Sequence, residues 1–313
     1  MNVIKKLFLI WTAVVVLASC SFFQKPVEPQ SNSLPSAPTA DSPSGLPSTE
    51  PTKNYQDRKK ITLVLGGAGV ASFATVGILK RLHEEGIIVE NLITSGWPSL
   101  FALARGFLGS IHDVEWFAMR LDEKDFAKLS NFDFAKKDAE EEKVTQLIES
   151  NFKRKELVDS KIPILISTTN NLGPEGESYN RGEWKTPLLR TMSVPGLFRR
   201  YPSTESSSVH SAVKAIDVEL ALRNEHKTVV AVEMYGDYFD FLEKGKKDST
   251  SGDFRKSHLA SLKNSLNQQL KEAALVGRIE LQSSPTNFSQ KRLAMLKGYK
   301  EGARLAKLIK KLD

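Results

Sequence analysis

Apolar residues of this 313-residue chain fall into short runs separated by segments with helical spacing, and the pattern begins only near residue 59. Short runs of β-branched residues and leucine, bounded by glycine or polar residues, indicate buried strands. They predict strands over 61–65, 91–95, 162–167, 229–233 and 278–281, and a hairpin edge over 178–184.

Apolar positions three or four residues apart indicate helices that bury one face. They predict helices over 73–85, 99–107, 139–152, 218–223 and 258–275, and a terminal helix carrying Leu305, Leu308, Ile309 and Leu312. The segment 235–253 is rich in Gly, Lys and Asp and is expected to be an exposed loop. Because strands alternate with helices, the expected fold class is α/β, a mainly parallel central sheet covered on both sides.

The first 58 residues differ in composition from the rest. Lys5 and Lys6 precede an apolar run over 7–17, which is shorter than the ~20 residues of a membrane span but suits a secretory signal. The run ends in Leu17-Ala18-Ser19-Cys20, which resembles the lipobox of bacterial lipoproteins. Three regions follow from this pattern: a signal peptide over 1–19, a lipidated Cys20 with a disordered Pro/Ser/Thr-rich tether over 20–58, and a folded domain over 59–313.

These features predict a protein of the bacterial cell envelope, anchored to the membrane by lipid on Cys20, with palmitate among its acyl groups. Ser21 follows the cysteine where Asp would favour the inner membrane, so the outer membrane, facing the periplasm, is expected. The formal charge of +7 includes clusters such as Arg304-Lys307-Lys310-Lys311, which suit either anionic headgroups or a soluble basic surface. Nucleic acid is a poor partner for an exported protein.

Metal and cofactor chemistry is not expected. Cys20 is the only cysteine, and the five histidines show no metal-ligand spacing, so neither a disulfide nor a metal site is predicted.

Glycine-containing turns follow the first two predicted strands. Gly66-Gly67-Ala68-Gly69 lies between the strand 61–65 and a helix, and Thr94-Ser95-Gly96-Trp97-Pro98 lies between the next strand and its helix. A strand, a tight turn and a helix form the nucleophile elbow of many serine hydrolases, with the serine at the apex of the turn. Here Gly96 stands at the apex, and glycine has no oxygen with which to attack an ester.

These turns, together with two later segments, resemble the patatin-like phospholipases. Ile162–Asn170 is similar to the central strand of that family, and Thr191–Phe198 to its alanine-serine-x-x-proline-x-leucine-phenylalanine segment. The resemblance covers most of the chain after the tether and implies a patatin-like three-layer α/β/α domain. In active members a Ser–Asp dyad does the chemistry: the aspartate takes the serine proton, and amides of the glycine loop hold the oxyanion.

Both members of the dyad are missing from the matching positions. The nucleophile position falls on Gly96 and the aspartate position on Val209, so the resemblance implies vestigial rather than catalytic residues. Gly66, Gly67 and Gly69 remain as an oxyanion loop that is expected to hold an anion such as a lipid phosphate or carboxylate. The chain is therefore interpreted as an inactive acyl-hydrolase homologue that binds lipid or an envelope partner.

Two other interpretations stay open. If Ser95 occupies the apex, the chain is an active patatin-like acyl-ester hydrolase, although Ile93 and Trp97 then fill sites that require small residues. The loop also resembles a dinucleotide-binding turn without its last glycine, which would make the domain a nucleotide-binding module. Glu90, however, lies at the start of the next strand, whereas such a site needs an acidic residue at the end.

Overall fold

The computed structural model describes residues 58–122, 141–152, 155–170, 176–194, 197, 209–210, 215–226, 228–244 and 249–312. The predicted signal peptide, Cys20 and nearly all of the predicted tether lie outside these ranges, so they remain predictions. Over the ranges just given, none of the helices combines the length and the apolar character that crossing a bilayer requires.

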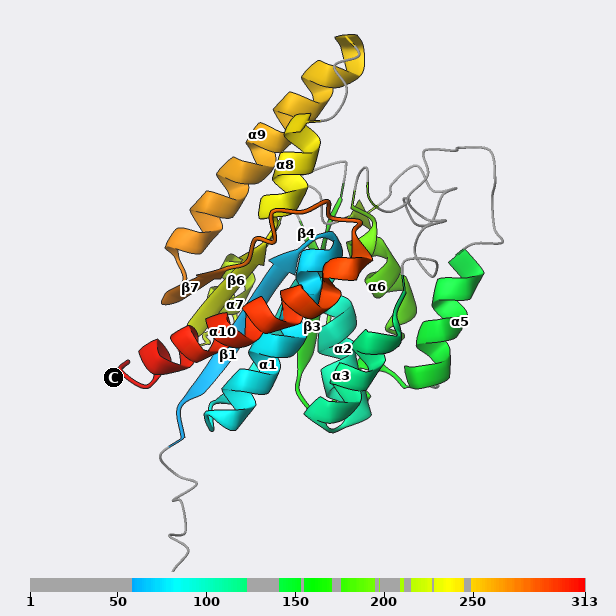
Figure 1. The fold of residues 1–313 in the computed structure, drawn as a ribbon. Coiled ribbons are helices and arrows are strands. Elements are labelled where there is room, and N and C mark those ends of the chain that lie inside the picture. The colour runs from blue at the N-terminus through cyan, green and yellow to red at the C-terminus, as the bar shows by residue number, and fades with distance from the viewer. Residues whose placement is uncertain are drawn as a thin grey trace, which may run out of the picture. The chain divides into compact units, whose positions relative to one another are not determined.

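A central sheet organises the domain (Figure 1). Its strands are β1 (Lys60–Gly67), β2 (Ile88–Gly96), β3 (Ile164–Asn170), β4 (Gly176–Tyr179), β5 (Val209–His210), β6 (Val229–Met234) and β7 (Leu275–Arg278). The strand order is β4-β3-β2-β1-β6-β7, with β5 also paired to β3. β4 and β5 run antiparallel to β3, and the other pairs are parallel. All six residues of β6 and seven of the eight in β1 are buried, because a parallel sheet is covered on both faces.

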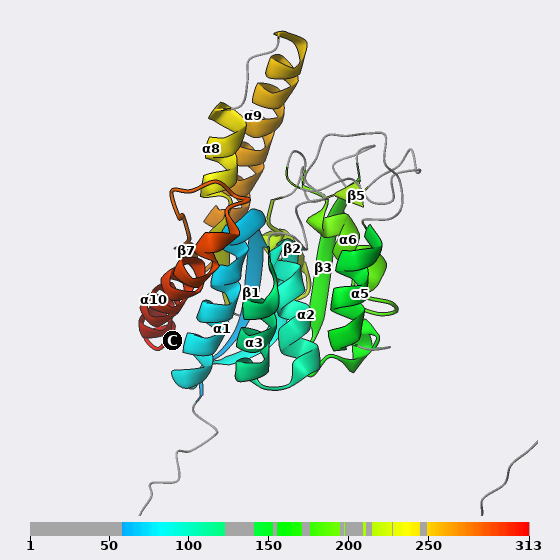
Figure 2. The same ribbon diagram turned by 45° about the vertical axis from the view of Figure 1, so that its right-hand side comes forward.

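Helices cover both faces of the sheet. On one face lie α1 (Ala74–Glu84), α2 (Pro98–Leu108), α3 (Ile111–Arg120) and α10 (Lys291–Ile309), while α7 (Val218–Arg223) packs against β1 and β6 from behind (Figures 1 and 2). The remaining helices are α5 (Glu141–Phe152), α6 (Lys185–Met192), α8 (Gly236–Lys244) and α9 (Ser249–Lys271). This arrangement confirms the predicted α/β class and its three-layer α/β/α architecture with a mainly parallel sheet.

Most predicted elements are present with their ends shifted by a few residues, but the expected loop over 235–253 is wrong. α8 occupies Gly236–Lys244 and α9 begins at Ser249. Tyr238, Phe239 and Leu242 give α8 a short buried face, which the surrounding polar residues conceal in the sequence. The strand expected over 278–281 is also displaced, since β7 ends at Arg278. Of the expected hairpin edge, β4 supplies one strand, which ends at Tyr179.

α10 crosses α1 at close range because glycine on each helix faces the backbone of the other. A Cβ on Gly77 would lie 1.9 Å from the carbonyl oxygen of Met295, and one on Gly298 would lie 2.0 Å from that of Ala74. The crossing therefore depends on the absence of side chains at these two positions.

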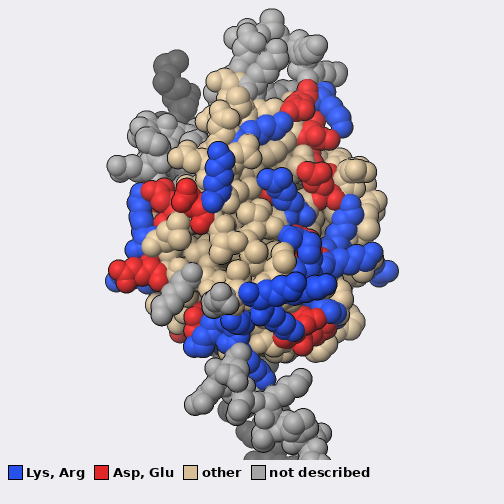
Figure 3. All heavy atoms as spheres, turned by 90° about the vertical axis from the view of Figure 1, so that its left-hand side faces the viewer, with Lys and Arg blue, Asp and Glu red and all other residues tan. Residues whose placement is uncertain are grey.

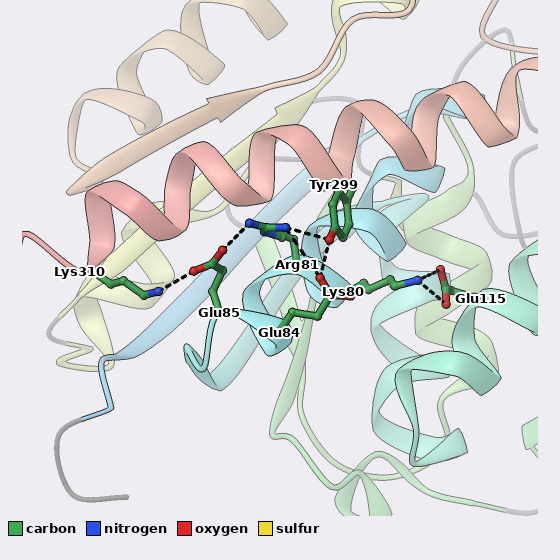
Figure 4. A network of polar contacts seen from close by, with 7 residues as sticks. All are labelled: Lys80, Arg81, Glu84, Glu85, Glu115, Tyr299 and Lys310. Atoms are coloured by element: carbon green, nitrogen blue, oxygen red, sulfur yellow. Dashed lines mark hydrogen bonds and ion pairs between the residues drawn. The ribbon is translucent and has the colours of Figure 1, made fainter. Parts of the chain in front are cut away.

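A polar network beside this crossing joins the two helices (Figure 4). Arg81 Nη1 donates to the hydroxyl of Tyr299 at 2.8 Å, and that hydroxyl donates to Glu84 at 2.6 Å. Glu85 pairs with both Arg81 and Lys310. The two acidic residues at the end of α1 are thus turned toward α10.

Candidate functional site

Gly96 forms the apex of the turn between β2 and α2. Its φ of +76° lies in the left-handed region that glycine adopts without steric cost. A Cβ at this position would lie 2.2 Å from the carbonyl oxygen of Gly67. Pro98 then starts α2 at a position where a missing N–H is tolerated. Local geometry and packing therefore both demand glycine at the apex.

The amides of this turn bond to groups within the chain. In elbow enzymes the amide that follows the nucleophile helps to hold the oxyanion. Here that amide, of Trp97, donates to the carbonyl oxygen of Gly67 at 3.1 Å. The amide of Gly96 donates to Thr191 Oγ1 at 2.8 Å, and the Thr191 hydroxyl donates to the carbonyl of Ser167 at 2.9 Å. The amides of Gly96 and Trp97 therefore both have acceptors within the chain.

Amides of the glycine loop also donate to carbonyl groups within the chain. Gly66 and Gly67 are the last residues of β1, and Gly69 begins a 3-10 helix, η2 (Gly69–Phe73). The amide of Ala68 donates to the carbonyl of Met234 at 3.4 Å, and the amide of Val70 to that of Pro285 at 2.8 Å. Two donors of the loop thus have carbonyl partners, and anion binding by Gly66, Gly67 and Gly69 stays a prediction.

Val209 and Ser95, the other predicted site residues, lie in strands that pair with β3. Val209, the vestigial aspartate position, begins β5 and pairs with Asn170 at the end of β3. Ser95 is 1% exposed and lies inside β2, one residue before the apex, where it pairs with Gly66 and with Ser167. The structure therefore brings Ser95 and the glycine loop together but places Ser95 in the strand.

A buried serine–aspartate pair, missed in the sequence, lies one strand further along the sheet. Ser167 Oγ donates to Asp217 Oδ2 at 2.6 Å, and the two residues are 1% and 4% exposed. Asp217 Oδ1 also accepts from the amide of Leu220 and so caps the start of α7. An aspartate before a helix is a recognisable cap in the sequence, but nothing local indicates its bond to a strand 50 residues earlier. The pair holds α7 to β3.

Glu233 is a buried carboxylate in the cross-strand row that also contains Gly66, Ser95 and Ser167. It lies in β6 opposite Gly66, is 6% exposed, accepts from the amide of Tyr235 at 3.0 Å and lies 3.6 Å from Arg278. Burial raises the pKa of Glu233 above its ordinary value, and this effect outweighs the amide and Arg278, which lower the pKa. The ionised form is therefore disfavoured in the folded protein.

We expect Glu233→Gln to make the protein more stable relative to wild type as pH rises. Since the pKa is raised in the folded state, the wild type loses stability from about pH 4.3, the ordinary glutamate pKa, upward to the folded pKa. Urea unfolding of both proteins between pH 4 and 7 measures this difference. Glu272→Gln, which removes an exposed carboxylate, is the control. A difference that stays constant with pH, or one shared by the control, would contradict the expectation.

Neither a nucleotide site nor a metal site gains support from the surroundings. Glu90 pairs with Lys60 at 2.8 Å near the start of β2, away from the glycine loop. Within the described part of the chain, no group of three or more His, Cys, Asp or Glu residues is placed to hold a metal ion.

Comparison with known proteins adds little to this geometry. No family model matches the chain, and no curated protein matches it. Among solved structures, VipD from Legionella pneumophila is similar with a TM-score of 0.47 and 12% identity, over 80% of this chain and 67% of that chain. A similarity this weak assigns no activity and no ligand.

Proposed function

We propose that this chain is a membrane-anchored, patatin-like lipoprotein whose domain does not hydrolyse acyl esters and instead binds lipid or an envelope partner. The anchor rests on Cys20 and the apolar run before it, and the family rests on the two glycine turns and the later segments that resemble it. We propose a binding role because a domain of this fold that no longer hydrolyses esters can still bind a ligand or a partner.

One observation carries the loss of hydrolysis. Gly96 lacks the hydroxyl, and the Trp97 amide that would hold the oxyanion donates to the carbonyl of Gly67 at 3.1 Å. Both the nucleophile and one oxyanion donor are thus missing from the same turn. Loss of a nucleophile and its base reduces a rate on the order of 10⁶-fold.

A basic surface supports a role at a membrane. Figure 3 shows Lys and Arg side chains gathered on the face that carries β7 and the end of α10. The exposed cationic residues of these elements and of the end of α9 are Lys271, Arg278, Lys300, Arg304, Lys307, Lys310 and Lys311. Arg278, Arg304 and Lys310 are ion-paired with Glu233, Glu301 and Glu85. Each of the other cations near an anionic bilayer contributes roughly 1 kcal/mol of attraction, so this face suits acidic headgroups.

We expect no labelling of the protein by a fluorophosphonate probe and no hydrolysis of p-nitrophenyl esters or phospholipids above background. The reason is that no described serine stands at the apex of the elbow. Intact-mass measurement after incubation with the probe reads out the adduct directly. Ser95→Ala and Ser167→Ala serve as matched variants, and an adduct on wild type that either variant abolishes would overturn the proposal.

The second candidate function is acyl-ester hydrolysis, and the hydrogen bond from Ser167 to Asp217 is the observation that favours it. A hydroxyl and a carboxylate 2.6 Å apart are the parts of a Ser–Asp dyad. Their burial, and the second bond of Asp217 to the Leu220 amide, favour the structural role instead. Labelling lost on Ser167→Ala but kept on Ser95→Ala would favour this candidate over the original Ser95 hypothesis.

A further inference from the structure

Trp116 is the most exposed large hydrophobic side chain in the described part of the chain, at 71%. It lies on the face of α3 that is turned away from the buried Val114 and Phe117. Trp97 and Trp184, in contrast, are each 4% exposed. A single exposed aromatic is ordinary on a protein surface, so the groups around Trp116 decide what it can bind.

A pocket of about 460 Å³ opens beside this indole. The volume falls within the roughly 300–1,000 Å³ of small-molecule sites. The pocket lies where the ends of α2 and α5 meet α3, and α2 lies between the other two helices (Figure 2). Because the elbow precedes α2, the pocket lies at the other end of that helix from Gly96. The described residues that line it are Leu108, Asp113, Trp116, Arg120 and Asn151.

Hydrogen bonds orient the polar groups of this lining. Arg120 Nη2 donates to Asn151 Oδ1 at 2.5 Å and thereby joins α3 to α5. This bond uses one of the five N–H groups of Arg120. The Ser110 hydroxyl donates to Asp113 Oδ2 at 2.7 Å, and Asp113 Oδ1 accepts no hydrogen bond from the described residues. The lining therefore offers a ligand both a carboxylate acceptor and guanidinium donors.

A buried aromatic cluster holds the helices that carry these groups. The ring of Phe152 lies 5.3 Å from that of Phe117 and 5.4 Å from that of Phe107, between ring centroids. All three side chains are buried. Phe117 and Phe152 directly follow Trp116 and Asn151 in the sequence, so the packing that fixes the cluster also fixes two sides of the pocket. A site that is arranged before its ligand arrives loses little conformational entropy on binding.

We propose that this pocket binds a neutral saccharide, with one sugar ring stacked on the indole of Trp116. A pyranose ring presents C–H groups on its faces, which pack on an aromatic ring, and hydroxyls at its rim, which both donate and accept hydrogen bonds. Asp113 and Arg120 supply an acceptor and donors beside the indole. One acidic and one basic residue give the described lining no net formal charge, which suits an uncharged ligand. The proposal does not depend on the loss of hydrolysis at the elbow.

A lipid surface suits the pocket less well than a saccharide does. Trp is a common anchor at the interface of a membrane. Here the acidic Asp113 lies one helical turn before Trp116, and an anionic bilayer repels a carboxylate. Leu108 is the only aliphatic residue of the described lining, so little apolar surface would accompany the indole into the bilayer.

Titration of the full-length chain with maltotetraose and with tetra-N-acetylchitotetraose tests the proposal. Binding is followed by intrinsic tryptophan fluorescence and by calorimetry. Trp116→Leu removes the stacking ring, Trp116→Phe keeps a smaller one, and Arg120→Met removes the guanidinium donors. Phe241→Leu is the matched control, because Phe241 is a partly exposed aromatic of α8 outside this pocket. A parallel arm measures co-sedimentation with phosphatidylcholine vesicles that contain or lack phosphatidylglycerol.

We expect saturable binding of at least one saccharide. Trp116→Leu and Arg120→Met should each weaken it about tenfold, Trp116→Phe should weaken it less, and Phe241→Leu less than twofold. Absence of saturable binding of both saccharides, or equal losses for Trp116→Leu and Phe241→Leu, would overturn the proposal. Vesicle binding that Trp116→Leu reduces, without any saccharide binding, would overturn it as well and would identify Trp116 as a membrane anchor.

Discussion

Gly96→Ala will lower the free energy of unfolding by about 2–5 kcal/mol. The left-handed backbone at φ +76° costs a residue with a Cβ about 1–2 kcal/mol. The new methyl group, 2.2 Å from the carbonyl oxygen of Gly67, adds about 1–3 kcal/mol of overpacking. Urea unfolding followed by circular dichroism measures the sum.

Gly182→Ala is the matched control for this loss. Gly182 has the same φ of +76°, but no atom lies within 4 Å of a Cβ built there. It should lose only the backbone part, about 1–2 kcal/mol. Equal losses at the two positions would show that the elbow is not closed as the structure describes. Gly96→Ser should lose as much stability as Gly96→Ala and gain no esterase activity, because the Trp97 amide still donates to Gly67.

Gly298→Ala will destabilise the crossing of α1 and α10 by about 2 kcal/mol. A Cβ at this position would lie 2.0 Å from the carbonyl oxygen of Ala74, and a helix backbone cannot turn away as a side chain can. Overpacking of this kind costs up to about 3 kcal/mol. The better helix propensity of alanine returns about 1 kcal/mol. The free energy of unfolding in urea gives the net effect.

Two variants on the same helix bracket this result. A Cβ on Gly302 would lie 2.9 Å from the Cβ of Arg81 and 3.2 Å from the backbone of Ile78, so Gly302→Ala has a milder clash than the 2.0 Å contact at Gly298 and should cost less. Lys300→Ala changes an exposed position and should stay within about 0.5 kcal/mol of wild type. A loss at Gly302 as large as that at Gly298 would contradict the close backbone contact.

The closed elbow also has a consequence for function. Thr191 bridges the Gly96 amide and the carbonyl of Ser167, so α6, β2 and β3 meet at the turn. In an active enzyme this corner must stay open for a substrate carbonyl. Here the amides of the turn bond within the chain, which supports the proposed loss of hydrolysis.

Local patterns were sufficient for the elements that surround the elbow. The apolar run 61–65 and the glycines after it predicted β1, and the helix expected over 218–223 is α7 at the same residues. The glycine at the apex was also evident, because the predicted strand 91–95, a turn and the predicted helix 99–107 follow one another directly in the sequence. These features depend on residues a few positions apart, so they can be predicted from the sequence alone.

The sequence by itself thus determined the α/β class, the central elements and the absence of a hydroxyl at Gly96. Only the tertiary structure decided that the Trp97 amide meets Gly67, that Ser167 meets Asp217, and that α8 replaces an expected loop. The physical reason is that backbone preference and periodicity act between residues a few positions apart. Partners across a sheet, in contrast, are set by strand order and register, which local preference does not encode.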